Sequence, residues 1–377
     1  MTKDSVVGLG VVGVGSIGIR SALDHFALGD LADKARIVAV CDPVGERAKA
    51  AAEKYGVPAW YDSYEALLSD ANVDAITLCS PIGLHYKQAM QALDAGKHIH
   101  SNKTITTTVD EINQIMVKAD ELGLKVVSSP GMMLMQHNQR MRRAVLEDRL
   151  GRVSLAVTGG TGGQQYHIDE PIRQGQDILT NTNPAWYFKK PGGGPLYDVG
   201  VYFLHILTGI LGPARQVSAF SGKAVSELNF RGEILPNEMD DSTFITLDFG
   251  NQLVGFMYAI VDGNFGNRLG PFTPYLVGTK ATLEGARLNG KSLIYETDHQ
   301  PHVTPAHKQL PESHVFEDIM QLVDWVRDGT PSLANLAHAR HVIDIIDSAY
   351  QSAASGQTLK LQDTTYQPLP LEALAEI

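Results

Sequence analysis

Three glycines near the start of the chain have the spacing that binds the phosphates of a dinucleotide. The segment Gly13-Val14-Gly15-Ser16-Ile17-Gly18 follows a short apolar run and opens a stretch with helical periodicity. In such a loop the first glycine permits a tight turn, the second lets a pyrophosphate approach the backbone, and the third lets the helix pack closely on the strand. Free N–H groups at the helix start, around Ser16 and Ile17, then attract the phosphates.

Asp42 narrows the choice of dinucleotide. It ends the next apolar run, 24 residues beyond Gly18. This is close to the usual spacing of about 20 for a carboxylate that accepts hydrogen bonds from ribose hydroxyls. Because the same charge repels a 2′-phosphate, we expect NAD rather than NADP. Arg47 is close enough in sequence to leave NADP open, although an exposed helix position explains this arginine more simply.

Alternating strands and helices must position this loop. Runs such as Ile37–Cys41 and Ala75–Cys79 have the texture of buried strands, and Glu46–Tyr55 and Val109–Leu122 have helical spacing. Continuous apolar strands between amphipathic helices predict a parallel sheet covered on both faces. We therefore expect an α/β Rossmann domain, for binding the dinucleotide, over residues 1–131.

The pattern changes after Gly131, where several strands alternate apolar and polar residues, which predicts a sheet with one buried face. Two amphipathic segments near the end, Phe316–Arg327 and Ala337–Ala353, predict helices. Residues 132–377 should form an α+β domain with an open, mainly antiparallel sheet, for substrate binding and oligomerisation. Strands are expected at Val153–Thr158, Gln216–Phe220, Thr243–Phe249, Val254–Ile260, Tyr275–Gly278 and Leu293–Glu296.

The composition argues against several kinds of partner. The chain has 377 residues, 19% of them charged, and a formal net charge of −11. With no Lys/Arg-rich block, neither nucleic acid nor a membrane surface is expected as a partner. Cys41 and Cys79 are too far apart in sequence for a paired-cysteine motif, and we find no signal peptide and no metal site. A cytoplasmic location is expected.

Three further motifs give the chain a family resemblance. They are Ser80-Pro81-Ile82-Gly83-Leu84-His85, Ala95-Gly96-Lys97-His98-Ile99-His100-Ser101-Asn102-Lys103-Thr104 and Gly192-Gly193-Gly194-Pro195-Leu196-Tyr197-Asp198-Val199-Gly200-Val201-Tyr202. In this order, from about Val11 to Leu361, the chain resembles the glucose–fructose oxidoreductase and inositol dehydrogenase family (Gfo/Idh/MocA). The resemblance implies a Rossmann domain, an open-faced second sheet covered by another subunit in a homodimer or homotetramer, and redox chemistry on a carbohydrate or cyclitol.

The resemblance also implies the reacting residues. Lys103 corresponds to the lysine of a Glu-Lys-Pro motif that lies beside the nicotinamide, with Asn102 and Thr104 replacing its neighbours. Asp198-x-Gly200-x-Tyr202 corresponds to an Asp-x-Gly-x-His motif, in the branch where tyrosine replaces histidine. Near the same cofactor we also expect Ser80, Pro81, His85 and Asn102.

Oxidation of an alcohol removes a hydride from carbon and a proton from oxygen, so a side chain must accept the proton. We expect Tyr202 to do so, with Lys103 polarising the substrate hydroxyl and lowering the pKa of the tyrosine. Asp198 would orient the substrate or Lys103, and His205 is the rival base. Simpler explanations stay open: Lys103 as a solvated lysine, Asp198 as a helix cap and Tyr202 as a core residue.

Further substrate contacts are expected from Asn138, His167 and Trp186, whose ring suits the face of a sugar. The sequence therefore predicts an NAD-dependent oxidoreductase for a sugar, sugar derivative or cyclitol. One alternative is a glycoside-processing enzyme that retains NAD and uses transient oxidation and elimination. The other is a non-catalytic regulator that senses the dinucleotide.

Overall fold

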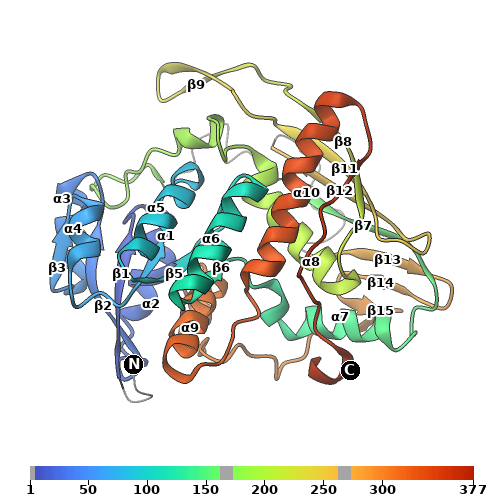
Figure 1. Ribbon diagram of the computed structural model, residues 1–377, viewed down its shortest axis with the longest axis horizontal. Helices are drawn as coiled ribbons and strands as arrows, with labels where there is room; N and C mark the ends of the chain where they lie inside the picture. Colours follow the sequence, from blue (N-terminus) through green and yellow to red (C-terminus); the bar gives the residue numbers. More distant parts are fainter. Residues whose placement is uncertain (1–4, 162–172, 262–272) are drawn as a thin grey trace.

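The computed structural model describes residues 5–161, 173–261 and 273–377, and two sheets organise it (Figure 1). The first has six parallel strands in the order β3-β2-β1-β4-β5-β6. The order reverses between β1 and β4, which is where ligands bind in such sheets. Its strands are β1 (Val7–Val12), β2 (Ala35–Cys41), β3 (Ala59–Tyr61), β4 (Ala75–Leu78), β5 (His98–Ser101) and β6 (Val126–Ser128).

Helices bury both faces of this sheet. The short edge strand β3 was not predicted, whereas the expected parallel, doubly covered architecture is confirmed. One face is covered by the helical stretch α1 (Ser16–Gly18), a π-helical turn (Ile19–Leu23) and α2 (Asp24–Phe26), together with α3 (Gly45–Tyr55) and α9 (Ser313–Asp328). The other face is covered by α4 (Tyr64–Ser69), α5 (Ile82–Asp94) and α6 (Val109–Leu122).

The second sheet has nine strands in the order β16-β15-β14-β13-β7-β12-β11-β8-β17. Among the described strands of this sheet, only β7 and β12 pair in parallel, so the predicted open, mainly antiparallel sheet is confirmed. Its strands are β7 (Val153–Thr161), β8 (Gln216–Gly222), β11 (Ser242–Asp248), β12 (Val254–Ile260), β13 (Tyr275–Gly278), β14 (Thr282–Glu284), β15 (Arg287–Leu288), β16 (Lys291–Ser292) and β17 (Leu359–Lys360).

One face of this sheet is buried under α7 (Gln136–Leu146), α8 (Val201–Leu211) and α10 (Leu336–Ser355). The opposite face is open: the side chain of Phe220 is 81% exposed and that of Phe244 is 40% exposed. Such contiguous apolar surface is typical of a protein interface.

Two expectations for the second half need correction. The strand expected at Leu293–Glu296 is wrong, because the edge strand β16 ends at Ser292. The helix α7 and the hairpin of β9 (Glu227–Phe230) and β10 (Glu233–Pro236) were not predicted. In α7, arginines take buried positions by pairing with carbonyls and carboxylates, so the apolar periodicity that identifies a helix is missing.

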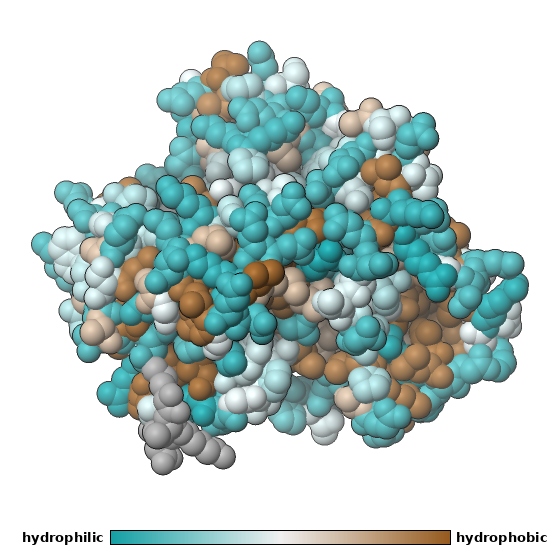
Figure 2. Space-filling model, viewed as in Figure 1, coloured by the Kyte–Doolittle hydropathy of each residue, from teal (hydrophilic) through white to brown (hydrophobic). Residues whose placement is uncertain are grey.

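The molecular surface in the view of Figure 2 is mainly hydrophilic, with hydrophobic side chains gathered at the lower right, over the region of α7 and β13–β15 in Figure 1. Among the described residues, no helix has the length and apolar character needed to cross a bilayer. Cys41 and Cys79 are both free thiols.

Candidate functional site

The glycine loop adopts the tight geometry that its sequence predicts. Gly13 has a φ of +88°, a conformation that residues with a side chain rarely adopt. A Cβ on Gly18 would lie 2.0 Å from the carbonyl oxygen of Gly13, so this glycine is needed for the helix to pack against the loop. A Cβ on Gly15 would meet only a methyl group of Thr182, at 3.7 Å. The protein therefore leaves the backbone at Gly15 open toward a ligand.

Asp42 is only 4% exposed and is tied to this loop. Its carboxylate accepts hydrogen bonds from the N–H of Val14 (3.2 Å) and the N–H of Val44 (2.9 Å). Arg47 also pairs with it, at 3.2 Å, and donates from Nε to the carbonyl of Ile178 (3.1 Å). Arg47 is therefore held against Asp42, not extended into solvent as an exposed helix residue would be.

Residues 173–184, which we call the strap, run from the second half of the chain across the glycine loop. Leu179 is buried in the core beneath the loop, and the carbonyls of Ile178 and Asn181 accept hydrogen bonds from Arg47. On the other side, Arg231 in the β9–β10 hairpin donates to the carbonyl of Thr182 at 2.9 Å. The strap is thus anchored to both halves of the chain.

A cavity of about 1380 Å³ extends from the glycine loop to the junction with the second half. Small-molecule sites commonly occupy ~300–1,000 Å³, so this cavity has room for a dinucleotide and a substrate together. The structure brings most of the sequence-predicted site residues to its wall: Gly13, Gly15, Ser16, Ile17, Asp42, Ser80, Pro81, Asn102, Lys103, Trp186, Asp198 and Tyr202.

Lys103 and Asp198 form an ion pair at the far end of this cavity. The Lys103 ammonium contacts the Asp198 carboxylate and donates to the Asp198 carbonyl oxygen at 2.8 Å. Both side chains are largely buried, at 15% and 8% exposure, so the pair is shielded from bulk water. Asp198 lies in a π-helical turn (Leu196–Gly200) that leads into α8, and it is held there by its contact with Lys103.

The loop that carries Lys103 is fixed by Asn102 and His85. The side-chain oxygen of Asn102 accepts a hydrogen bond from the Lys103 N–H (2.8 Å). The two ring nitrogens of His85 lie 2.8 Å from the Thr104 carbonyl and 2.7 Å from the Ser80 carbonyl. His85 is buried and not on the cavity wall, and it joins the loop after β4 to the loop after β5.

The electrostatics of Tyr202 correct one expectation. Burial, reinforced by Glu312 and Asp198, raises the pKa of Tyr202 well above its ordinary value. The Lys103 ammonium does not reverse this, because it lies over the ring, 5.4 Å from its centroid, and is paired with Asp198. The prediction that Lys103 lowers the pKa of Tyr202 is therefore not supported.

Several predicted contacts lie elsewhere. His205 is 3% exposed and packs against His338 of α10, with 4.4 Å between ring centroids, and burial lowers its pKa to about 3. Asn138 is fully buried and donates to the carbonyl of Met132 at 2.7 Å. The structure brings neither residue to the cavity wall. His167 falls outside the described residues.

The structure adds residues that the sequence interpretation missed. The hydroxyl of Tyr202 lies 3.0 Å from Nε2 of His314, and both residues line the cavity. The carboxylate of Glu312 lies 3.8 Å from the same nitrogen and pairs with Arg20 at 2.9 Å. In the sequence, the only indication of these residues was the Glu312-Ser313-His314 triplet, which lies just before the late amphipathic segment. The helix predicted for that segment begins after the triplet and therefore leaves it out.

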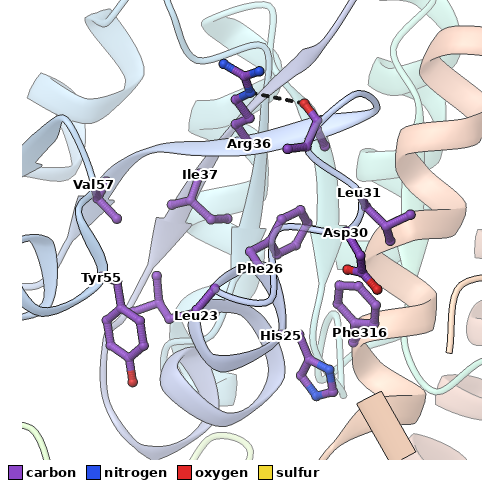
Figure 3. Close-up of a pocket in the computed structure, with 13 residues that line it drawn as sticks. Leu23, His25, Phe26, Asp30, Leu31, Arg36, Ile37, Tyr55, Val57 and Phe316 are labelled. Carbon is purple, nitrogen blue, oxygen red and sulfur yellow. Dashed lines mark hydrogen bonds between the residues drawn. The ribbon is translucent and has the colours of Figure 1, made fainter. Parts of the chain in front are cut away.

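Packing of α9 on the first sheet places His314. Phe316 stacks on His25 of α2 with 4.6 Å between ring centroids and 8° between planes. Both rings border a separate cavity of about 160 Å³, and Figure 3 shows Phe316 beside His25 in its wall. Two residues further along α9, Asp318 accepts hydrogen bonds from Ser129 (2.6 Å) and the Gly131 N–H (3.0 Å). The helix is thereby fixed at the junction of the two halves.

Comparison with protein families identifies both halves. Residues 7–129 match the GFO_IDH_MocA oxidoreductase family with an NAD-binding Rossmann fold, and residues 138–284 match the GFO/IDH/MocA C-terminal domain.

The relatives with a named activity are only distantly similar to this chain in sequence. D-glucoside 3-dehydrogenase of Escherichia coli K12 is 27% identical over 249 residues, covering 64% of this chain and 66% of the relative. D-xylose 1-dehydrogenase (NADP⁺) 2 of Haloferax volcanii is 28% identical over 211 residues, covering 56% and 59%. These matches thus span less than two thirds of the relatives' own length. Levoglucosan dehydrogenase, solved with NADH and L-sorbose, shares the fold with a TM-score of 0.75 at 18% identity, covering 94% and 99% of the two chains.

Proposed function

The chain belongs to the Gfo/Idh/MocA oxidoreductase family, and on that premise we propose that it transfers a hydride between nicotinamide and a hydroxyl-bearing carbon of a sugar, sugar derivative or cyclitol. The observation that carries the proposal is the buried Lys103–Asp198 pair facing Tyr202, in the same cavity as the glycine loop. The relatives named as D-glucoside, D-xylose and levoglucosan dehydrogenases support the substrate class.

The residues of the loop fit a dinucleotide. Gly13 and Gly18 shape a turn with no space for side chains, and Gly15 presents open backbone where a pyrophosphate would bind. When bound, the dinucleotide supplies the hydride acceptor of the reaction. We favour NAD because the Asp42 carboxylate, held beside the glycine loop, would accept hydrogen bonds from the ribose hydroxyls and would repel a 2′-phosphate. The NADP-dependent relative from Haloferax volcanii is the reason to measure both cofactors.

In this proposal the Lys103–Asp198 pair binds the reacting hydroxyl. The ammonium donates a hydrogen bond to the substrate oxygen and favours the alkoxide character that develops as hydride leaves. Asp198 holds Lys103 in place through their ion pair. Trp186, also on the cavity wall, offers a flat apolar face to a sugar ring. Asn138 and His205 have no part in it, since neither lines the cavity.

The test is Lys103→Ala, assayed by NADH absorbance with a panel of sugars and cyclitols. We expect NADH binding to persist and kcat to fall about 100-fold or more, the usual contribution of one such group. Lys87→Ala, at an exposed position of α5, is the matched control and should behave as the wild type. Activity that survives nearly unchanged in Lys103→Ala would exclude the proposed site.

The anchored strap favours a second candidate, an enzyme that retains NAD and processes glycosides by transient oxidation. Residues on both sides of the glycine loop hold the strap across it, and this would slow release of the dinucleotide. In that case purified protein carries NAD or NADH through gel filtration, and a glycoside is cleaved without net NADH formation. Stoichiometric NADH release with an oxidised sugar would instead support the simple dehydrogenase.

The remaining assignments are also proposals. We assign residues 1–131 to dinucleotide binding and 132–377 to substrate binding and assembly. The exposed apolar face that carries Phe220 and Phe244 supports a homodimer or homotetramer, which sedimentation of the wild type and Phe220→Asp would test. We expect a cytoplasmic protein that does not bind nucleic acid, in keeping with the net charge of −11.

A further inference from the structure

The proposed reaction needs a group that can take a proton at neutral pH, and Tyr202 alone does not meet this need. Burial and the nearby carboxylates of Glu312 and Asp198 raise the pKa of Tyr202, so its phenolate is not populated at neutral pH. A neutral tyrosine can still pass a proton on, because its oxygen accepts one hydrogen while its own O–H donates another.

His314 lies where such a proton would go. Its Nε2 is 3.0 Å from the Tyr202 oxygen, and the two rings meet edge to face with 5.6 Å between centroids. Burial, with a smaller contribution from Lys103, lowers the pKa of His314, so the ring is neutral at pH 7 and can accept a proton. Among the described residues, this is the histidine in contact with the Tyr202 hydroxyl.

The charges around His314 come from four parts of the chain. Glu312, two residues earlier, favours the protonated ring from 3.8 Å, and Arg20 from the π-helical turn holds that carboxylate. Lys103 after β5 disfavours the protonated ring, but its charge is balanced by Asp198 from the turn before α8. An imidazolium formed here would thus have an acidic partner within reach.

We infer that His314 is the proton acceptor of the reaction and that Tyr202 relays the proton to it. This inference rests on the proposed function. As the substrate C–H bond breaks and its hydrogen leaves as hydride for the bound dinucleotide, the substrate hydroxyl proton moves to the Tyr202 oxygen. The Tyr202 O–H proton moves at the same time to Nε2 of His314. The products are a carbonyl, the reduced dinucleotide and an imidazolium beside Glu312, so atoms and charge balance.

The relay requires a definite protonation state, which can be measured without substrate or cofactor. Nε2 must be unprotonated near pH 7.5 so that it can accept from Tyr202, with the proton on Nδ1. Nitrogen NMR of histidine-labelled protein reports this tautomer, with His314→Gln assigning the signal. We expect an unprotonated Nε2 that protonates at a lower pH in Glu312→Gln than in the wild type. A proton on Nε2 at pH 7.5 would overturn the relay.

Kinetic measurements provide the second test of the relay. In His314→Gln, which keeps a polar partner for Tyr202, we expect unchanged NADH affinity, a kcat for oxidation about 100-fold lower, and loss of the acid limb of the pH–rate profile. In His314→Ala, added imidazole should restore activity at least tenfold. A role limited to holding Tyr202 predicts the opposite: the acid limb persists in His314→Gln, and imidazole has no effect.

Failure of this inference can be told apart from failure of the proposed function. The proposed function is contradicted if the wild type fails to reduce NAD with every sugar of the panel, or if the Lys103→Ala variant keeps full activity. An active wild type with a protonated Nε2, or with an intact acid limb in His314→Gln, counts against His314 alone. His299→Gln, at an exposed position, is the matched histidine control and should leave both the profile and kcat unchanged.

Discussion

The two ends of the cavity are built differently, one mainly from backbone and the other from side chains. At the glycine-loop end, the backbone of one short segment forms the turn, where Gly13 turns and Gly18 packs without a side chain. At the other end, the contacts come from side chains on three distant segments, represented by Lys103, Tyr202 and His314. The first end depends on local sequence, and the second depends on how α8 and α9 are seated.

This difference predicts the largest effect for Gly18→Ala. Alanine suits the helical φ of −59° at this position, but its Cβ would lie 2.0 Å from the Gly13 carbonyl oxygen, so the loop must move. We expect the Kd for NADH, measured by fluorescence titration, to rise about 100-fold, which corresponds to about 2.7 kcal/mol. Gly222→Ala, where nothing lies within 4 Å of the added Cβ, is the control. Binding within threefold of wild type would mean that close packing does not shape the site.

The second prediction concerns the seating of α9. His302 is buried between Glu317 (3.0 Å) and Asp324 (3.0 Å) of this helix. Despite the opposing effect of burial, the hydrogen bonds that the His302 ring donates to the carboxylates of Asp324 and Glu317 raise its pKa to about 9. A raised histidine pKa stabilises the fold fully below the unfolded value of about 6.5, and this stabilisation is lost as the pH rises through about 9.

Accordingly, His302→Ala should lower the apparent free energy of unfolding by about 3 kcal/mol at pH 6, because it leaves buried Glu317 without its cationic partner. The difference from wild type should shrink by about half or more at pH 10. Urea unfolding at the two pH values measures it, with His299→Ala as the control. A pH-independent difference would show that His302 contributes packing and no charge.

The same contrast explains which parts could be predicted from sequence. The glycine loop and Asp42 carry their own spacing signal, and α6 has its predicted bounds, Val109–Leu122, because its periodicity is local. Lys103 and Asp198 required a family resemblance, since nothing nearby in sequence shows that they meet.

His314 was indicated neither by local spacing nor by the family resemblance. Its place beside Tyr202 depends on α9 crossing back to the first sheet through contacts such as Phe316 with His25. The expectation that His205 lies at the site has the same origin. Helical spacing placed it near Tyr202, but only the packing of α10 shows that its ring is buried against His338.

A third prediction concerns Asp42, which contributes one side chain to the backbone-built end. Asp42→Ala should weaken NAD binding about tenfold, by loss of charge-assisted hydrogen bonds to the ribose, and should weaken NADP binding less. It also frees Arg47 to meet a 2′-phosphate, which limits the loss for NADP, so Arg47→Ala in the same background should remove this difference between the two cofactors. Parallel NADH and NADPH titrations measure this. A larger loss for NADPH than for NADH would contradict the assignment of NAD.

The smallest effect is expected for His205→Gln, which alters a residue of α8, the helix that also carries Tyr202 of the site. Burial holds the pKa of His205 at about 3, so the ring stays neutral over the working range, and it is absent from the cavity wall. Its removal should cost about 1 kcal/mol of stability through lost packing on His338, and should change kcat less than threefold. Tyr202→Phe, three residues earlier on the same helix, is the comparison and should lower kcat about 100-fold. If the two variants lose activity equally, the acid–base group cannot be assigned from contact with the cavity, and His205 returns as a candidate base.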